Sequence, residues 1–598
     1  MKKFAVPTLV VLVLALSSCS QMVSHVLKTN ERGYDSMIAQ MNVMVPMRDG
    51  IKLATDIYRP RKPGKYPAIL CRMPYGTDLK IYKLLARMFV SQGYIFLNQD
   101  TRGTFSSEGT YFPLAAEWED GHDTVDWVVK QPWFNGKLGA WGGSYFGYTQ
   151  WEEAVDEPAI NAMVPMLTTG NMRAIAFRGG AAEYASFTPW NTQMQNAWNQ
   201  KHGIKQTLTV DLLSGGYFND PIRPAKPILV REIFDDENML SKGLEVLLHH
   251  PGDIDNLYQA NFDPFYARVS APCLLLAGWY DMFTGPQLED FKRMRQEGKD
   301  DAKMTRIIIG PWTHGAPGIP NNPMFHQSMT SGIGITGREM MAWYDHWLKG
   351  KDNGAEKAAP MKIFVMGENQ WRDENEWPLA RTKWTSFYLH SSGKANSDKA
   401  DGKLDMTAPA KESSDQFDYD PANPVPTMGG NFLPSPKFQA GAMDQAKIEK
   451  REDVLVYVTD PLQSPVEVTG PVKMILYARS DARDTDFTAK LVDVWPDGKV
   501  INLCDGIIRA RYRSSITNPS EIVPGKIYQY EIDMWATSNL FKAGHRIGLE
   551  ISSSNFPQFD RNTNCLGEGY GECHKIAHQT ILHDLENQSR LVLPVIPR

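Results

Sequence analysis

The stretch Lys137-Leu138-Gly139-Ala140-Trp141-Gly142-Gly143-Ser144-Tyr145-Phe146-Gly147 joins a strand-like run to a serine flanked by glycines. Its first half is short and apolar, which favours a buried strand, and Tyr148–Val155 after it is helix-like. A sharp strand-to-helix turn of this kind exposes the nucleophile of many hydrolytic enzymes, because the strained backbone requires small neighbours. The stretch therefore predicts an α/β fold with Ser144 as a candidate nucleophile.

The turn departs from the usual Gly-x-Ser-x-Gly spacing. Phe146 occupies the place of the second glycine, and Gly147 follows one residue later. A Gly/Ser pattern this short arises by chance in roughly one such chain in five, given ordinary glycine usage. The prediction therefore needs partner residues elsewhere in the sequence.

Two partner residues follow strand-like runs further along the chain. Asp281 closes Gly278-Trp279-Tyr280-Asp281 after one apolar run, and His314 lies in Gly310-Pro311-Trp312-Thr313-His314-Gly315 after another. Open α/β sheets build their sites at the carboxyl ends of strands, and the order Ser, Asp, His is the one this fold requires. Singly, each is more commonly a turn or loop residue. Together they predict a triad in which His314 is the base and Asp281 orients it.

Short apolar runs alternate with helical patterns around this stretch, such as the helix predicted at Glu117–Lys130. This alternation predicts a doubly wound, mostly parallel sheet, opened by a hairpin around Arg48-Asp49-Gly50. The predicted buried strands are Pro67–Cys71, Tyr94–Asn98, Lys137–Trp141, Cys273–Ala277 and Arg306–Gly310.

The chain is longer than one hydrophobic core supports, so several domains are expected. We assign an α/β-hydrolase domain to residues 36–170 and 263–354, with an inserted helical lid at 171–262. Residues 355–598 switch to a period of two, which predicts an all-β sandwich. Within it, Ser391–Gly430 is polar and is predicted to be a long surface loop.

The first 19 residues predict export. Lys2 and Lys3 precede the apolar run Val6–Leu16, which is too short to span a bilayer, and Ser17-Ser18-Cys19 follows. This ending resembles a bacterial lipobox, which would make Cys19 the lipidated first residue of the mature chain. An ordinary cleaved signal peptide is the alternative. Either way we expect the periplasm or the cell surface, with membrane contact only through a lipid at Cys19.

Charge and cysteine usage restrict the partners. The net charge is −6 and there is no basic run, so nucleic acid is not expected.

Cys71, Cys273 and Cys504 lie in apolar runs and are predicted to be buried thiols. Cys565 and Cys573 flank a glycine-rich loop and are predicted to form a disulfide. A zinc site of these two cysteines with His574 and His578 is the alternative, although its spacing fits no familiar pattern.

From about residue 40 to the end, the chain resembles the family of serine hydrolases that includes cocaine esterase, α-amino-acid ester hydrolase and X-Pro dipeptidyl-peptidase. The motifs that carry the resemblance are Met73-Pro74-Tyr75-Gly76, Asp100-Thr101-Arg102-Gly103 with Ser107-Glu108-Gly109, Gly142-x-Ser144-Tyr145-x-Gly147, Gly278-Trp279-Tyr280-Asp281 and Gly310-Pro311-Trp312-x-His314-Gly315. The Gly-x-Ser-Tyr-x-Gly form is the family's own, which accounts for the unusual spacing.

The resemblance implies a secreted enzyme that cleaves ester or acyl amide bonds through an acyl-enzyme, without a metal or organic cofactor. It implies an oxyanion hole made of the Tyr145 backbone N–H and the Tyr75 hydroxyl. It also implies a jelly-roll form for the C-terminal sandwich. Asp100 and Arg102 are interpreted as a structural charged pair beside the site.

The substrate is expected to be a small ester or amide. The aromatic residues of the predicted lid could bind an acyl or aryl group or could form its core; they are Phe177, Tyr184, Phe187, Trp190 and Trp198. Met282 and Phe283 follow Asp281 where the amino-acid ester branch has acids for an ammonium group, so an uncharged substrate is favoured. Glu183 or Asp211 could replace those acids.

Three alternatives remain. Two are an α-amino-acid ester hydrolase and an X-Pro dipeptidyl aminopeptidase, and the third is an inactive lipoprotein that binds a glycan or a partner. The oligomeric state is left open.

Overall fold

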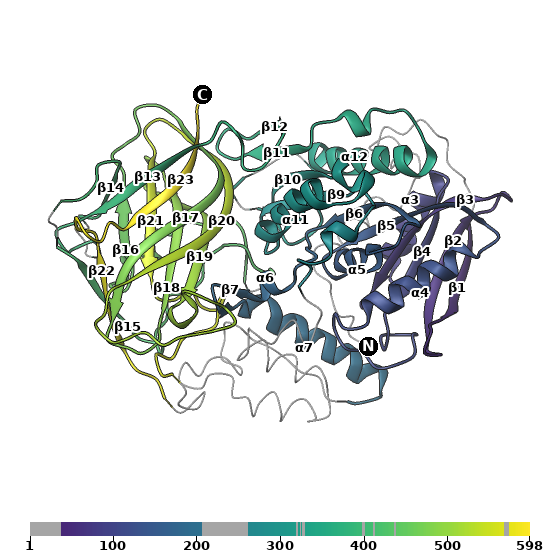
Figure 1. Ribbon diagram of the computed structural model, residues 1–598, viewed down its shortest axis with the longest axis horizontal. Coiled ribbons are helices and arrows are strands. Elements are labelled where there is room, and N and C mark those ends of the chain that lie inside the picture. Colours follow the sequence, from purple (N-terminus) through teal and green to yellow (C-terminus); the bar gives the residue numbers. More distant parts are fainter. Residues whose placement is uncertain are drawn as a thin grey trace.

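A computed structural model describes residues 37–205, 261–318, 321–322, 324–325, 329–396, 401–410, 413–435, 438–566 and 573–598. The chain forms an α/β domain followed by an all-β domain, as predicted (Figure 1). Cys19, Asp211 and residues 206–260 of the predicted lid lie outside the described residues.

In the described part of the chain, ten strands form the first sheet, in the order β1-β2-β4-β3-β5-β6-β9-β10-β11-β12. The strands from β4 to β11 in this order are parallel, and the pairs at the two edges are antiparallel. The bounds are β1 Met37–Pro46, β2 Lys52–Pro60, β3 Tyr66–Met73, β4 Ile95–Asp100, β5 Phe134–Gly143, β6 Ile160–Met166, β9 Leu274–Tyr280, β10 Arg306–Thr313, β11 Met361–Val365 and β12 Gln370–Glu374.

Helices cover both faces of this sheet because successive strand residues point to opposite sides. In β3, Ala68 and Leu70 pack in one core with α4 (Glu117–Val129), α5 (Tyr145–Ala154) and α11 (Thr284–Glu297). Ile69 and Cys71 pack in the other core, with α3 (Lys80–Ser91) and α12 (Met329–Lys349). The sheet is therefore doubly wound, as predicted.

The described part of the predicted lid lies between the two domains. It contains α6 (Arg173–Ala176), the short hairpin strands β7 (Phe177–Arg178) and β8 (Ala181–Ala182), and α7 (Tyr184–Lys201). Helix α7 crosses the lower part of the view in Figure 1. Short 3₁₀ helices occur elsewhere, at Tyr266–Arg268, Asp300–Met304, Ala355–Lys357, Ile448–Lys450 and Ala510–Tyr512.

The C-terminal domain is a β-sandwich. Its strands are β13 Lys383–His390, β14 Lys403–Asp405, β15 Asp415–Tyr419, β16 Leu455–Val458, β17 Val466–Ser480, β18 Asp486–Val494, β19 Val500–Arg509, β20 Tyr528–Phe541, β21 Arg546–Ser552, β22 Ala577–Leu582 and β23 Arg590–Ile596.

The predicted C-terminal domain begins at residue 355, and its first two strands, β11 and β12, join the first sheet, where Ile307 pairs with Met361. One expectation about this half of the chain is wrong. The predicted surface loop Ser391–Gly430 contains β14 and β15, and β15 pairs with β22. The sequence of β15 is mostly polar because this strand is buried on one face only. Its buried Phe417 and Tyr419 alternate with exposed polar residues.

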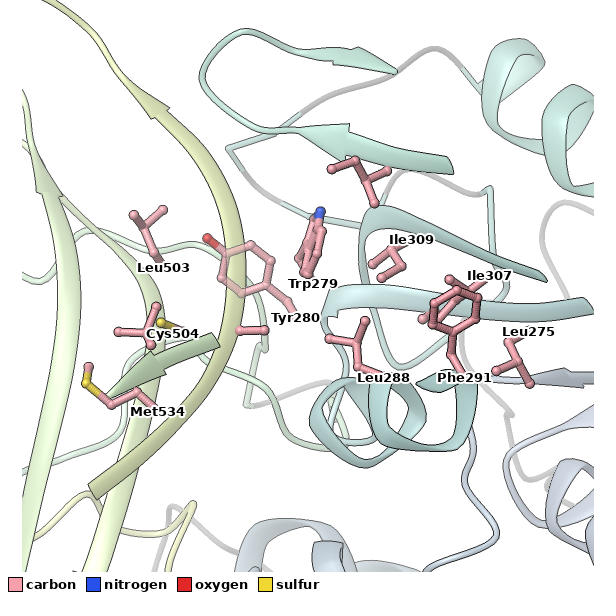
Figure 2. Close-up of a cluster of buried hydrophobic side chains, with 14 of the residues drawn as sticks. Leu275, Trp279, Tyr280, Leu288, Phe291, Ile307, Ile309, Leu503, Cys504 and Met534 are labelled. Atoms are coloured by element: carbon pink, nitrogen blue, oxygen red, sulfur yellow. The ribbon is translucent and has the colours of Figure 1, made fainter. Parts of the chain in front are cut away.

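The two domains share a buried interface, part of which Figure 2 shows. At the end of β9, the Tyr280 side chain points into the C-terminal domain, and its hydroxyl donates to the Asn502 carbonyl at 2.7 Å. The neighbouring Trp279 indole donates to the Phe364 carbonyl at 2.8 Å. Tyr280 and Trp279 are almost fully buried, so the end of β9 is fixed by contacts outside its own strand pairings.

The cysteines fall into two groups. Cys71, Cys273 and Cys504 are buried free thiols, and loss of hydration raises the pKa of each above its ordinary value. Cys565 and Cys573 are joined in a disulfide, so their sulfurs are not available for the alternative zinc site. His578 Nδ1 instead lies 2.6 Å from Asp418 Oδ1.

Over the described ranges, none of the helices is both long and apolar enough to cross a bilayer.

Candidate active site

Ser144 occupies the tight turn between β5 and α5. Its backbone has φ 56° and ψ −126°, a region that residues with a side chain rarely adopt, and its side chain is partly exposed. A Cβ added at Gly142 would lie 2.3 Å from the Phe146 carbonyl oxygen, and one at Gly147 would lie 2.4 Å from Thr168 Cγ2. Both positions therefore require glycine. This local packing explains why the second glycine comes one residue later than in the usual spacing.

Ser144, His314 and Asp281 form a continuous hydrogen-bonded chain. His314 Nε2 lies 3.1 Å from Ser144 Oγ, and His314 Nδ1 lies 2.7 Å from Asp281 Oδ2. Asp281 and His314 directly follow β9 and β10, neighbouring strands of the same sheet. The three side chains meet because the carboxyl ends of parallel strands lie at one edge.

The Asp281 carboxylate is fully buried and held by two contacts. One oxygen faces His314, and the other accepts the backbone N–H of Phe283 at 2.9 Å. The Phe283 ring lies beside the His314 imidazole, with centroids 5.5 Å apart. These contacts fix the orientation of the imidazole toward Ser144.

Tyr75, just after β3, also contacts Ser144. Its hydroxyl hydrogen-bonds with the Ser144 side chain and accepts the indole N–H of Trp190 at 3.1 Å. Burial of the hydroxyl raises the pKa of Tyr75 to about 12, although the two hydrogen bonds oppose that rise. Tyr75 is therefore a neutral hydroxyl at physiological pH.

Tyr145, the residue after Ser144, is anchored by its side chain. Its hydroxyl donates to Glu117 Oε1 at 2.7 Å and accepts the Leu114 backbone N–H at 2.9 Å. The other Glu117 oxygen pairs with Arg72 at 2.9 Å, and Arg72 is completely buried. This anchor was not predicted. Its one signal in the sequence is an arginine inside the apolar run before Tyr75.

The expected pairing of Asp100 with Arg102 is wrong. Arg102 forms ion pairs with Asp49 and Asp120, both at 2.6 Å. Asp100 accepts the backbone N–H groups of Thr77 and Ser106, and burial raises its pKa to about 7. Asp100 therefore supports the Tyr75 loop through backbone contacts, and Arg102 pairs with other acids.

The candidate substrate residues separate clearly. Of the five lid aromatics, Trp190 contacts Tyr75, whereas Tyr184 packs on Phe556 and Trp198 packs on His202. Phe177 is buried and Phe187 is partly buried in the same apolar cluster as Tyr184.

Glu183 is fully buried and ion-paired with Arg178, so its carboxylate is already used. Met282 and Phe283 are also buried in that cluster and give the site an apolar wall.

The arrangement provides a hydroxyl, an imidazole and a carboxylate in series, next to a second hydroxyl and the start of a helix. Such a site can perform acyl transfer. Among the residues that the structure describes, no group of three or more His, Cys, Asp or Glu side chains is arranged to hold a metal ion.

The fold and this site together define a serine hydrolase of the α/β class. The family described as X-Pro dipeptidyl-peptidase (S15 family) matches residues 49–316, and its C-terminal non-catalytic domain matches residues 353–592. The chain is 37% identical over 570 residues to cocaine esterase from Rhodococcus sp. (strain MB1 Bresler), covering 93% of this chain and 98% of the relative. The chain therefore belongs to the family of cocaine esterase and the X-Pro dipeptidyl-peptidases.

Solved structures share the whole architecture. An aminopeptidase from a marine sediment archaeon (Thaumarchaeota archaeon) is 25% identical, with a TM-score of 0.76. An α-amino acid ester hydrolase is 24% identical, with a TM-score of 0.77. Each match covers 94% of this chain and 97% of the other, so both domains are part of the shared fold.

Proposed function

We propose that this enzyme hydrolyses small ester or acyl amide substrates through an acyl-enzyme formed on Ser144. The observation that carries the proposal is the hydrogen-bonded chain from Ser144 Oγ to His314 and on to Asp281, at 3.1 and 2.7 Å. Ser144 attacks the carbonyl carbon while His314 Nε2 takes its proton, and Asp281 stabilises the resulting imidazolium. His314 then protonates the leaving alcohol or amine. A water molecule repeats the sequence on the acyl-enzyme and releases the acid.

The tetrahedral intermediate needs donors for its negative oxygen. We assign this role to the Tyr145 backbone N–H and the Tyr75 hydroxyl. The N–H belongs to the first residue of α5, where backbone N–H groups lack helical partners, and the partial positive charge of the helix terminus favours an anion. Tyr75 stays protonated and can donate, since its pKa is raised to about 12.

Among possible substrates, an uncharged acyl group is favoured. The Phe283 ring beside His314 and the buried Met282 provide apolar contact, and Glu183 is committed to Arg178. The relative with 37% identity is named an esterase, which agrees with this preference.

Substitution of the nucleophile tests the mechanism. We expect Ser144→Ala to lower kcat for p-nitrophenyl acetate by at least about 10⁴-fold, because the acyl-enzyme cannot form. A fluorophosphonate probe should label the wild type and not the variant. Full activity in Ser144→Ala would refute the proposal that Ser144 is the nucleophile. A wild type that neither hydrolyses the ester nor reacts with the probe would favour the binding-protein alternative.

A substrate panel separates the enzyme alternatives. Aryl esters, amino-acid esters and X-Pro amides are compared by kcat/KM with the same preparation. We expect the neutral aryl esters to have the highest value. A preference for substrates with a free ammonium group would instead favour the amino-acid ester hydrolase or X-Pro peptidase assignment.

We further propose that the chain is exported and anchored through a lipid on Cys19. The lipobox-like ending at residues 16–19 supports this proposal. The disulfide between Cys565 and Cys573 is consistent with an oxidising compartment.

A further inference from the structure

Trp190 contacts both residues that we assign to the oxyanion hole. Its indole N–H donates to the Tyr75 hydroxyl at 3.1 Å. Its ring also stacks on the Tyr145 ring, with centroids 6.0 Å apart and planes inclined by 25°. Trp190 lies on α7, within the segment inserted into the α/β domain. A side chain from the inserted segment therefore contacts both parts of the assigned oxyanion hole.

Hydrogen-bonding capacity determines where the Tyr75 proton points. An indole N–H can only donate, and a phenol hydroxyl has one hydrogen to give. Because Trp190 donates to the Tyr75 oxygen, the Tyr75 hydrogen must be directed to another acceptor. The Ser144 side chain is the other partner of this hydroxyl, and like the Trp190 contact it lowers the pKa of Tyr75, as a bond accepted by the phenol oxygen does. The Tyr75 hydrogen therefore remains for an oxygen of the substrate bound beside Ser144.

We propose that Trp190 is a positioning residue of the oxyanion hole, which orients and polarises the Tyr75 hydroxyl through its indole N–H. The inference rests on the proposed function, since it assigns Trp190 a role in the same reaction. A hydroxyl that accepts one hydrogen bond becomes a stronger donor in the next, because hydrogen bonds in a chain polarise one another. The Trp190 contact also lowers the pKa of Tyr75 relative to the effect of burial alone.

Helix α7 is held firmly enough for this role. At its start, the Tyr184 N–H donates to the Gln558 carbonyl at 2.8 Å, and the Ser186 hydroxyl accepts the Leu433 N–H at 3.1 Å. At its end, Lys201 Nζ donates to the Gly103 and Ser107 carbonyls at 2.9 and 2.6 Å. These contacts tie α7 to both domains, and a site on a fixed helix is positioned more accurately than one on a loop.

A double-mutant cycle tests the proposal. Trp190→Phe keeps an aromatic ring over Tyr145 and removes the N–H, and Tyr75→Phe removes the hydroxyl. We measure kcat and KM for p-nitrophenyl acetate in the wild type, both single variants and the double variant. Loss of one hydrogen bond predicts a fall in kcat of about 3- to 10-fold in Trp190→Phe, with little change in KM. In the Tyr75→Phe background, the same substitution should change kcat by less than about 2-fold, since the partner hydroxyl is gone.

A second variant separates the N–H from the shape of the ring. Benzothienylalanine at position 190 replaces the indole nitrogen with sulfur and keeps the bicyclic outline, so it should reproduce the loss in kcat. Its melting temperature should match that of the wild type.

Three results would overturn the inference: wild-type kcat in both position-190 variants, equal losses in the presence and absence of the Tyr75 hydroxyl, or a rise in KM alone. Each of these leaves the Ser144→Ala result unchanged. Failure of the Ser144 mechanism is recognised separately, by activity in Ser144→Ala.

Discussion

Glu152 and Glu153, on helix α5, which begins at Tyr145, are two buried acids. Loss of hydration raises the pKa of each to about 8, although Tyr148 hydrogen-bonds to Glu152 and Arg72 lies 3.7 Å from Glu153. Arg72 already pairs with Glu117, so one buried positive charge serves several carboxyls. At neutral pH the folded enzyme therefore retains protons on this helix that an unfolded chain would release.

This arrangement predicts a pH-dependent stability. The folded-state pKa of Glu152 is about 8 and its ordinary value is 4.5, so between these values the folded state binds a proton that the unfolded state has lost. The free energy of unfolding should therefore fall by about 1.4 kcal/mol for each pH unit as pH rises through this window. Above the window it should stay level. Glu152→Gln stays neutral throughout, so its melting temperature should fall less between pH 5 and pH 8.

The matched control is Glu586→Gln, an exposed acid in the C-terminal domain. Its melting curve should follow that of the wild type across the same pH range. Parallel pH profiles for Glu152→Gln and the wild type would contradict the prediction.

The sequence indicated the reacting residues but not their supports. Ser144, Asp281 and His314 could be proposed together because each follows a strand, and their order along the chain is characteristic. Asp100 and Arg102 were paired wrongly because nearness in sequence says little about which way a side chain turns. The contact between Trp190 and Tyr75 joins residues 115 positions apart, and no local pattern encodes it.

The hairpin β7–β8 attaches the inserted segment to the C-terminal domain. Its buried Arg178 contacts Glu183 at 3.3 Å and Asp505 at 3.2 Å. The guanidinium also lies 3.9 Å above the Trp535 ring. One arginine thus contacts acids from two domains where water is excluded, and it opposes the effect of burial, which raises the pKa of Glu183 to about 8.

Loss of this arginine should destabilise the enzyme strongly. Arg178→Gln leaves the Glu183 and Asp505 carboxyls buried without their cation, so we expect a loss of about 3–5 kcal/mol in the free energy of unfolding. Chemical denaturation at pH 7 measures it. Arg483→Gln is the control, because its ion pair with Glu521 is exposed and should contribute about 1 kcal/mol or less. Equal effects of the two substitutions would refute the assignment.

Elements were predicted well where the pattern was continuous and poorly where it was ambiguous. The strands that precede Ser144, Asp281 and His314 each contain a continuous run of buried residues, as buried parallel strands do. The half-buried β15 was taken for a loop because its polar residues outnumber its apolar ones. The place of strand β11 in the first sheet could not be predicted, because period alone does not specify a pairing partner.

For the whole molecule, the proposed lipid anchor determines where the enzyme acts. We expect a strain expressing the wild type to incorporate labelled palmitate into the protein, and Cys19→Ser to abolish the label because the acceptor thiol is gone. The Ser144→Ala variant should retain the label, since its change lies in another site. Label in Cys19→Ser would contradict the anchor and favour an ordinary signal peptide.

The contact of Tyr280 with the second domain has a consequence for how this enzyme can be rebuilt. Asp281, which orients the imidazole, is the residue after Tyr280, and the Tyr280 hydroxyl is bonded to the Asn502 carbonyl. The domain described as non-catalytic thus holds the strand end from which the triad carboxylate extends. Exchanging C-terminal domains between relatives would alter turnover as well as solubility. The two domains are best engineered, and compared between species, as one catalytic unit.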